Sequence, residues 1–120
     1  MDYVLVDQDQ RPGRNGVTMW RLTFYCVDDR TLWEMTVDPT YDNFKRSGWD
    51  HVVRDENSYG VYTDLKRTKR KTQEGTPIVS ADSPARITYR CQDRQEALRL
   101  VEANETPSAP NTFRELFANE

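Results

Sequence analysis

Residues 17–38 read VTMWRLTFYCVDDRTLWEMTVD, and this stretch decides the fold. Large apolar side chains alternate in it with smaller or polar ones, the period-two pattern of a half-buried β-strand. In the first half, one face carries Trp20, Leu22, Phe24 and Cys26, and the other carries Arg21, Thr23 and Tyr25. The segment Thr31–Asp38 alternates in the same way, and Asp28-Asp29 is typical of a tight turn. We therefore predict a β-hairpin made of Val17–Cys26 and Thr31–Asp38.

Further strands are predicted on both sides of this hairpin. Short runs rich in β-branched and aromatic residues occur at Tyr3–Asp7, Asp50–Val53, Tyr59–Leu65, Thr76–Ala81 and Arg86–Cys91. The segment Gln8–Gly16 contains Pro-Gly and Asn-Gly pairs, which indicate an exposed loop. A short helix is predicted at Tyr41–Ser47, between the N-cap Thr40 and Gly48. A second helix is predicted from Asp93 to about Ala103, because Asp93 and Glu96 form a capping box before an apolar stripe.

This order of elements predicts a mainly β fold. A small five- to six-stranded barrel of OB type, with a short helix between strands 3 and 4 and a C-terminal helix, has the same order. A small mixed β-sheet with a packed C-terminal helix is the alternative. Residues 1–104 are expected to form one barrel-like domain, and residues 105–120 a flexible linker with an acidic and apolar tail. The side chains assigned to the core are Trp20, Phe24 and Trp33.

Composition limits the classes of function. No apolar stretch reaches the roughly 18 residues of a membrane helix, and the N-terminus lacks the pattern of a signal peptide, so we expect no membrane role and a cytoplasmic location. Cys26 and Cys91 lie far apart in a chain with a single histidine, His51. Such a set does not supply the clustered ligands of a zinc site, so both cysteines are expected to be small core residues. No cofactor or metal is predicted.

Positive charge is concentrated in one place. Residues 66–92 hold 7 basic and 2 acidic residues, giving +5, whereas residues 1–65 hold 7 and 12, giving −5. The run Lys66-Arg67-Thr68-Lys69-Arg70-Lys71 would be cationic on both faces of a strand, so we expect it to project from the fold as an arm. Such an arm neutralises phosphates and binds more weakly as salt is added.

In an OB-type barrel, the loop at residues 8–16 and the basic run would flank one ligand groove. Phosphate contacts are therefore predicted from both, and exposed aromatic rings beside them would stack on the bases of a single strand. The predicted nucleic-acid-binding residues are Arg11, Arg14, Arg21, Tyr25, Tyr62, Lys66, Arg67, Lys69, Arg70 and Lys71. Other aromatic residues considered for stacking are Tyr41, Phe44, Trp49 and Tyr59.

The C-terminal tail offers a second binding feature. Phe113, Leu116 and Phe117 have the i, i+3, i+4 spacing of a short amphipathic helix, with glutamates around them. We expect this patch to bind a protein partner or a neighbouring subunit, or to pack on its own domain.

The leading hypothesis is a non-catalytic protein that binds single-stranded DNA or RNA, as an accessory in phage or mobile-element replication or recombination. The alternative is a protein-interaction or inhibitor module without a nucleic-acid role. A third hypothesis is a metal-dependent nuclease that uses Asp38, Asp64 and Lys66, because acidic residues and a lysine can hold Mg²⁺ and activate water.

Overall fold

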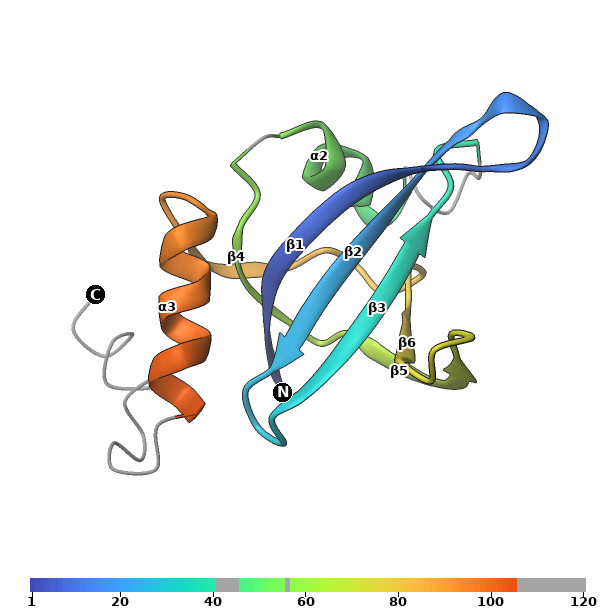
Figure 1. The fold of residues 1–120 in the computed structure, drawn as a ribbon. Helices are drawn as coiled ribbons and strands as arrows, with labels where there is room; N and C mark the ends of the chain where they lie inside the picture. Colours follow the sequence, from blue (N-terminus) through green and yellow to red (C-terminus); the bar gives the residue numbers. More distant parts are fainter. Residues whose placement is uncertain (41–45, 56, 106–120) are drawn as a thin grey trace.

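The computed structural model describes residues 1–40, 46–55 and 57–105 (Figure 1). Seven strands, two helices and one 3₁₀ turn are placed along these residues. They are β1 (Asp2–Pro12), η1 (Arg14–Gly16), β2 (Thr18–Cys26), β3 (Thr31–Val37), α2 (Trp49–Arg54), β4 (Gly60–Thr63), β5 (Lys66–Lys71), β6 (Pro77–Ser80), β7 (Ile87–Arg90) and α3 (Arg94–Glu105).

The strands form one sheet in the order β5-β6-β3-β2-β1-β4-β7. Neighbouring strands are antiparallel, except for a parallel contact between β3 and β6 at Glu34 and Ile78. The mainly β fold predicted from the sequence is therefore confirmed. Closure into an OB-type barrel is not confirmed, because the described sheet is open, with β5 at one edge and β7 at the other.

The hairpin of β2 and β3 agrees with its prediction to within one residue at each end. Phe24 faces Trp33 across this hairpin, and Tyr25 faces Leu32. At the turn, Arg30 adopts a left-handed backbone with φ 60°, and its amide donates a hydrogen bond to the Cys26 carbonyl oxygen. β1 is longer than predicted, because residues 8–12 continue as a strand against β2 instead of forming a loop.

The two helices cover opposite faces of the sheet. Alternate residues of β1 point to different sides, so Leu5 packs in a core with Phe24 and Trp49, and Val4 packs in a second core with Leu100. The first core lies under α2 and the second under α3. In Figure 1, the β5–β6 hairpin lies on the far side of β1–β3 from α3.

The strand predicted at Asp50–Val53 is wrong, because these residues belong to α2. Trp49, Val52 and Val53 are spaced i, i+3, i+4, which places all three on one helical face, and that face is buried. Trp49 packs edge-on against Phe24, with ring centroids 5.9 Å apart, and its indole N–H donates to the Ser83 carbonyl oxygen at 2.8 Å. The tryptophan thus fixes α2 to the sheet.

The predicted C-terminal helix is confirmed as α3. The Glu96 amide donates to Asp93 Oδ1 at 2.9 Å, as a capping aspartate requires, and Glu96 in turn accepts from the Gln92 amide. Most of the helix predicted at Tyr41–Ser47 lies outside the described residues. Neither helix of the described chain is both long and apolar enough to span a bilayer.

Candidate functional site

Most cations of the basic run are exposed on β5, at the edge of the sheet. Lys66, Lys69, Arg70 and Lys71 are all exposed, and none of them forms an ion pair with another described residue. Four unpaired positive charges within one short strand create a local field that attracts anions, although the whole chain carries a net charge of −3.

A bulge shapes this strand. Arg67 pairs with Val79, and Lys71 pairs with Pro77. The chain therefore advances four residues along β5 where it advances only two along β6. The Thr68 hydroxyl holds the excess backbone by donating to the Ile78 carbonyl oxygen at 2.6 Å and accepting from the Arg70 amide at 3.2 Å. Bulges redirect side chains and often occur at functional sites. Here the bulge contains Lys69 and Arg70.

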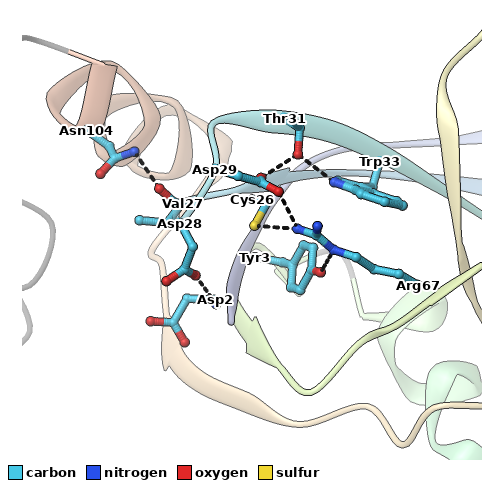
Figure 2. Close-up of polar contacts among 10 residues, drawn as sticks. All are labelled: Asp2, Tyr3, Cys26, Val27, Asp28, Asp29, Thr31, Trp33, Arg67 and Asn104. Carbon is cyan, nitrogen blue, oxygen red and sulfur yellow. Dashed lines mark hydrogen bonds and ion pairs between the residues drawn. The ribbon is translucent and has the colours of Figure 1, made fainter.

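Arg67 differs from its neighbours because it is directed into the fold (Figure 2). Its guanidinium lies 4.3 Å from the centroid of the Trp33 ring and forms an ion pair with Asp29 at 2.8 Å. The Nε–H donates to the Tyr3 hydroxyl at 2.7 Å, and a terminal N–H donates to Cys26 Sγ at 3.0 Å. The expectation that the whole run projects as an arm is therefore wrong, because Arg67 anchors β5 to β1, β2 and β3.

We call the residues that contact the guanidinium, Tyr3, Cys26, Asp29 and Trp33, the Arg67 pocket. Two of these residues are themselves held by hydrogen bonds. Thr31 donates to Asp29 at 2.5 Å and accepts from the Trp33 indole at 2.7 Å, which holds both groups around the guanidinium (Figure 2). Burial disfavours the charged guanidinium, but the hydrogen bonds to Tyr3 and Asp29 outweigh this effect and raise the pKa of Arg67. Because its charge is matched by Asp29, Arg67 contributes little positive potential to the surface.

Arg21 is also neutralised within the protein. Its guanidinium donates two hydrogen bonds to Asp9, at 2.7 and 3.2 Å, and lies 4.0 Å from Glu34. The hydrogen bond to Asp9 raises the pKa of Arg21. The predicted role of Arg21 as a phosphate contact is not supported by this arrangement, because two carboxylates already compete for it.

The structure overturns the predicted stacking role of Tyr25 and Tyr62, because both rings are only 2 % exposed. α3 covers the face of β2 that carries Tyr25, and Asn104 of that helix donates to the Tyr25 hydroxyl at 3.2 Å. Tyr62 packs against Trp49 and donates to the Ser58 carbonyl oxygen at 2.6 Å, and burial raises its pKa. Neither ring therefore offers a face to a base.

The other aromatic candidates offer no stacking platform within the described residues either. Trp49 is fully buried, and Tyr59 packs partly buried against both cores. Tyr41 and Phe44 lie outside the described residues, as do the partner-binding candidates Phe113, Leu116 and Phe117.

A hollow of about 870 Å³ lies at the end of the β1–β2 hairpin, and Arg11 lines it with Thr36 and Asp38. A second hollow, of about 270 Å³, is lined by Arg70, Ile78 and again Thr36. Thr36 on β3 therefore lies between the two hollows. Arg11 is exposed and has no ion pair among the described residues, whereas for Arg14 the structure describes only the backbone of the 3₁₀ turn η1.

The residues of the nuclease hypothesis are not brought together. Asp38 follows β3 near the Arg11 end of β1, whereas Asp64 follows β4 beside the Asp2 end of β1. Asp64 also forms an ion pair with Arg86 at 3.4 Å. In the described part of the chain, no three His, Cys, Asp or Glu side chains are grouped so that they could hold a metal ion.

Two features of the site carry no signal in the sequence, the Arg67 pocket and the position of Thr36. Asp29 and Trp33 are distant from Arg67 in sequence, and only the pairing of β5 with the rest of the sheet brings them near. Thr36 stands in an alternating strand pattern and carries no distinguishing signal. No protein-family model, curated protein or solved structure matches this chain, so the site is defined by its geometry and charge alone.

Proposed function

We propose that the chain is a non-catalytic nucleic-acid-binding protein that contacts the sugar-phosphate backbone through the exposed cations of β5. The single observation that carries this proposal is the group Lys66, Lys69, Arg70 and Lys71, exposed and without an ion pair among the described residues. Nucleic acid is a polyanion whose phosphates are neutralised by lysine and arginine.

The rigid base of β5 supports this proposal. Arg67 fixes the start of the strand to the sheet, and Thr68 fixes the bulge. The backbone that carries the four cations is therefore held in position. A positioned cation loses less conformational entropy on binding than one on a mobile loop. This arrangement favours a phosphate contact over a charge run that serves only hydration.

The described residues support contact with phosphates more than contact with bases. The large hydrophobic side chains exposed among them are Met1 and Leu32, and neither is aromatic. Binding through β5 is therefore expected to depend weakly on base sequence and strongly on salt.

The test is a fluorescence-anisotropy titration of labelled oligo-dT and of a duplex at several salt concentrations. The double variant Lys69→Gln/Arg70→Gln removes two cations of the bulge. The slope of log K against log salt should become shallower by about 1.4 for a single strand or about 1.8 for a duplex.

Arg30→Gln/Arg99→Gln is the matched control, because it removes two exposed arginines that have no ion pair among the described residues and lie outside β5. It should leave the slope within error of the unmodified chain. Equal losses in both double variants would show a general effect of net charge, and no binding at low salt would overturn the proposal.

The protein-interaction hypothesis has one observation in its favour. β5 is an edge strand, and lysines on an edge strand also prevent unwanted pairing with other sheets. On that hypothesis the cations protect the edge and bind no polyanion. A chain that does not bind either oligonucleotide at low salt, but whose β5 variants aggregate, would favour this second function.

A further inference from the structure

The two hollows beside β3 are neighbours, because Thr36 lines both of them. We call the two hollows, together with the Thr36 surface between them, the Thr36 groove. It runs from the end of the β1–β2 hairpin, across β3, to the β5–β6 hairpin. One hollow is lined by Arg11, Met19 and Asp38, the other by Arg70, Ile78 and Asp82, and both by Thr36.

Each end of the Thr36 groove carries an exposed arginine. Arg11 lines the larger hollow and Arg70 the smaller one, and neither has an ion pair with another described residue. Between them lies the short side chain of Thr36, with the partly buried apolar side chains of Met19 and Ile78 nearby. Each hollow thus combines an exposed arginine with a partly buried apolar side chain.

Two carboxylates also line the groove and oppose the arginines. Asp38 Oδ1 accepts hydrogen bonds from the Thr40 amide at 2.9 Å and from the Thr40 hydroxyl at 2.6 Å. Asp82 is exposed at the end near Arg70, in the turn that follows β6. The excess positive charge at this end comes from Lys69 and Lys71 beside Arg70.

We propose that the Thr36 groove holds a single strand of nucleic acid, with phosphates at Arg11 and Arg70 and the intervening nucleotides over Thr36. This inference rests on the proposed function, because Arg70 belongs to the β5 site. A single strand can bend to follow a cationic groove. A duplex is stiff, with a persistence length of about 150 base pairs, so it would contact β5 without entering the groove.

The charge of residue 36 tests the path directly. Thr36 is exposed on a strand, so both Thr36→Glu and Thr36→Lys should fold. Oligo-dT affinity should fall about fivefold for Thr36→Glu, the effect of two like charges some 4 Å apart in water, and rise for Thr36→Lys. A folding defect would weaken both variants. Gln95→Glu and Gln95→Lys, exposed on α3, make the same charge changes away from the groove and should have little effect.

The dependence of affinity on oligonucleotide length gives a second, independent test of the path. Arg70→Gln should weaken oligo-dT of every length, whereas Arg11→Gln should weaken only those long enough to reach from β5 to the hairpin end. Asp38→Asn should tighten binding of the long oligonucleotides by removing a repulsive charge. Binding of a duplex should respond to Arg70→Gln but not to Arg11→Gln or the Thr36 variants.

The outcomes separate this inference from the proposed function. If the chain binds oligo-dT through β5 but Arg11→Gln and both Thr36 variants have no effect at any length, the groove path is wrong and the β5 site stands. If a duplex competes as well as a single strand and responds equally to Thr36→Glu, the preference for a single strand is wrong. If removal of the β5 cations leaves oligo-dT binding unchanged, both the groove path and the β5 site are wrong.

Discussion

The guanidinium of Arg67 lies over the indole of Trp33, with the Cζ atom 4.3 Å from the ring centroid. This contact separates one residue of the basic run from the others. The other four cations of β5 are exposed, whereas Arg67 is held between an aromatic ring and the carboxylate of Asp29. One cation of the run therefore positions the strand, and the others are available to a ligand.

Replacing Arg67 should destabilise the protein. Arg67→Ala removes a cation–π contact, an ion pair and hydrogen bonds to Tyr3 and Cys26, so we expect the free energy of unfolding to fall by about 2 kcal/mol. Arg67→Lys should recover only part of this loss, because an ammonium cannot reproduce the planar fork. Urea unfolding measures the difference. Lys69→Ala is the control and should change stability by no more than about 0.5 kcal/mol.

Acid should weaken the Arg67 anchor. Burial alone would raise the pKa of Asp29, but hydrogen bonds from Thr31, Cys26 and Arg67 outweigh it and lower that pKa below its ordinary value of 3.8. A carboxyl group with a lowered pKa in the folded state stabilises the protein above its unfolded pKa, and this contribution is lost as pH falls through the folded pKa.

The stability difference between the unmodified chain and Asp29→Asn should therefore be constant near neutral pH and shrink below about pH 4. Unfolding curves recorded from pH 7 to pH 2.5 test this. Glu74→Gln, which removes an exposed carboxyl group in the β5–β6 turn, serves as the control and should show no such convergence. A difference that stays constant down to pH 2.5 would show that Asp29 is not the titrating group.

The β5 bulge should depend on the hydroxyl of Thr68. Thr68→Val keeps the side-chain shape but removes both hydrogen bonds, so the Arg70 amide loses its acceptor and stability falls by about 1 kcal/mol. Amide hydrogen exchange should show faster exchange at Arg70. Thr68→Ser retains the hydroxyl and should retain the protection. Equal protection of Arg70 in both variants would mean that the hydroxyl does not hold the bulge.

Both cysteines should be unreactive in the folded protein. They are fully buried and free, and burial raises the pKa of both thiols, that of Cys91 to about 12. The reactive thiolate is therefore scarce at pH 8. A colorimetric thiol assay should detect both groups only after denaturation. In Arg67→Ala, Cys26 should become the faster of the two, because its contact with Arg67 is lost while Cys91 is unchanged.

Local patterns were enough to predict the hairpin and the last helix. The alternation in residues 17–38 specifies two half-buried strands whatever surrounds them, and the capping pair Asp93 and Glu96 specifies where α3 begins. The strand predicted at Asp50–Val53 is wrong because four residues cannot show whether their period is 2 or 3.6. Including Trp49 in the pattern reveals the helical spacing.

The candidate site was harder to predict from the sequence than the hairpin or α3, because it depends on tertiary packing. Tyr25 lies on the polar side of an alternating strand, and the sequence alone predicted an exposed ring. A helix from the far end of the chain covers that face, so the ring is buried. The sequence likewise could not distinguish Arg67 from Lys69, since both are cations in one strand, until the β2–β3 turn supplied Asp29 as a partner.

By itself, the sequence determined a mainly β chain with a concentrated positive charge, because side-chain periodicity and charge are properties of neighbouring residues. Only the tertiary structure decided that the sheet stays open, that Arg67 is an anchor and that Arg11 and Arg70 line two neighbouring hollows on either side of Thr36. These features arise where strands distant in sequence come together. The physical reason is that burial and ion pairing depend on which elements pack against each other. Local patterns along the chain do not specify such contacts between distant segments.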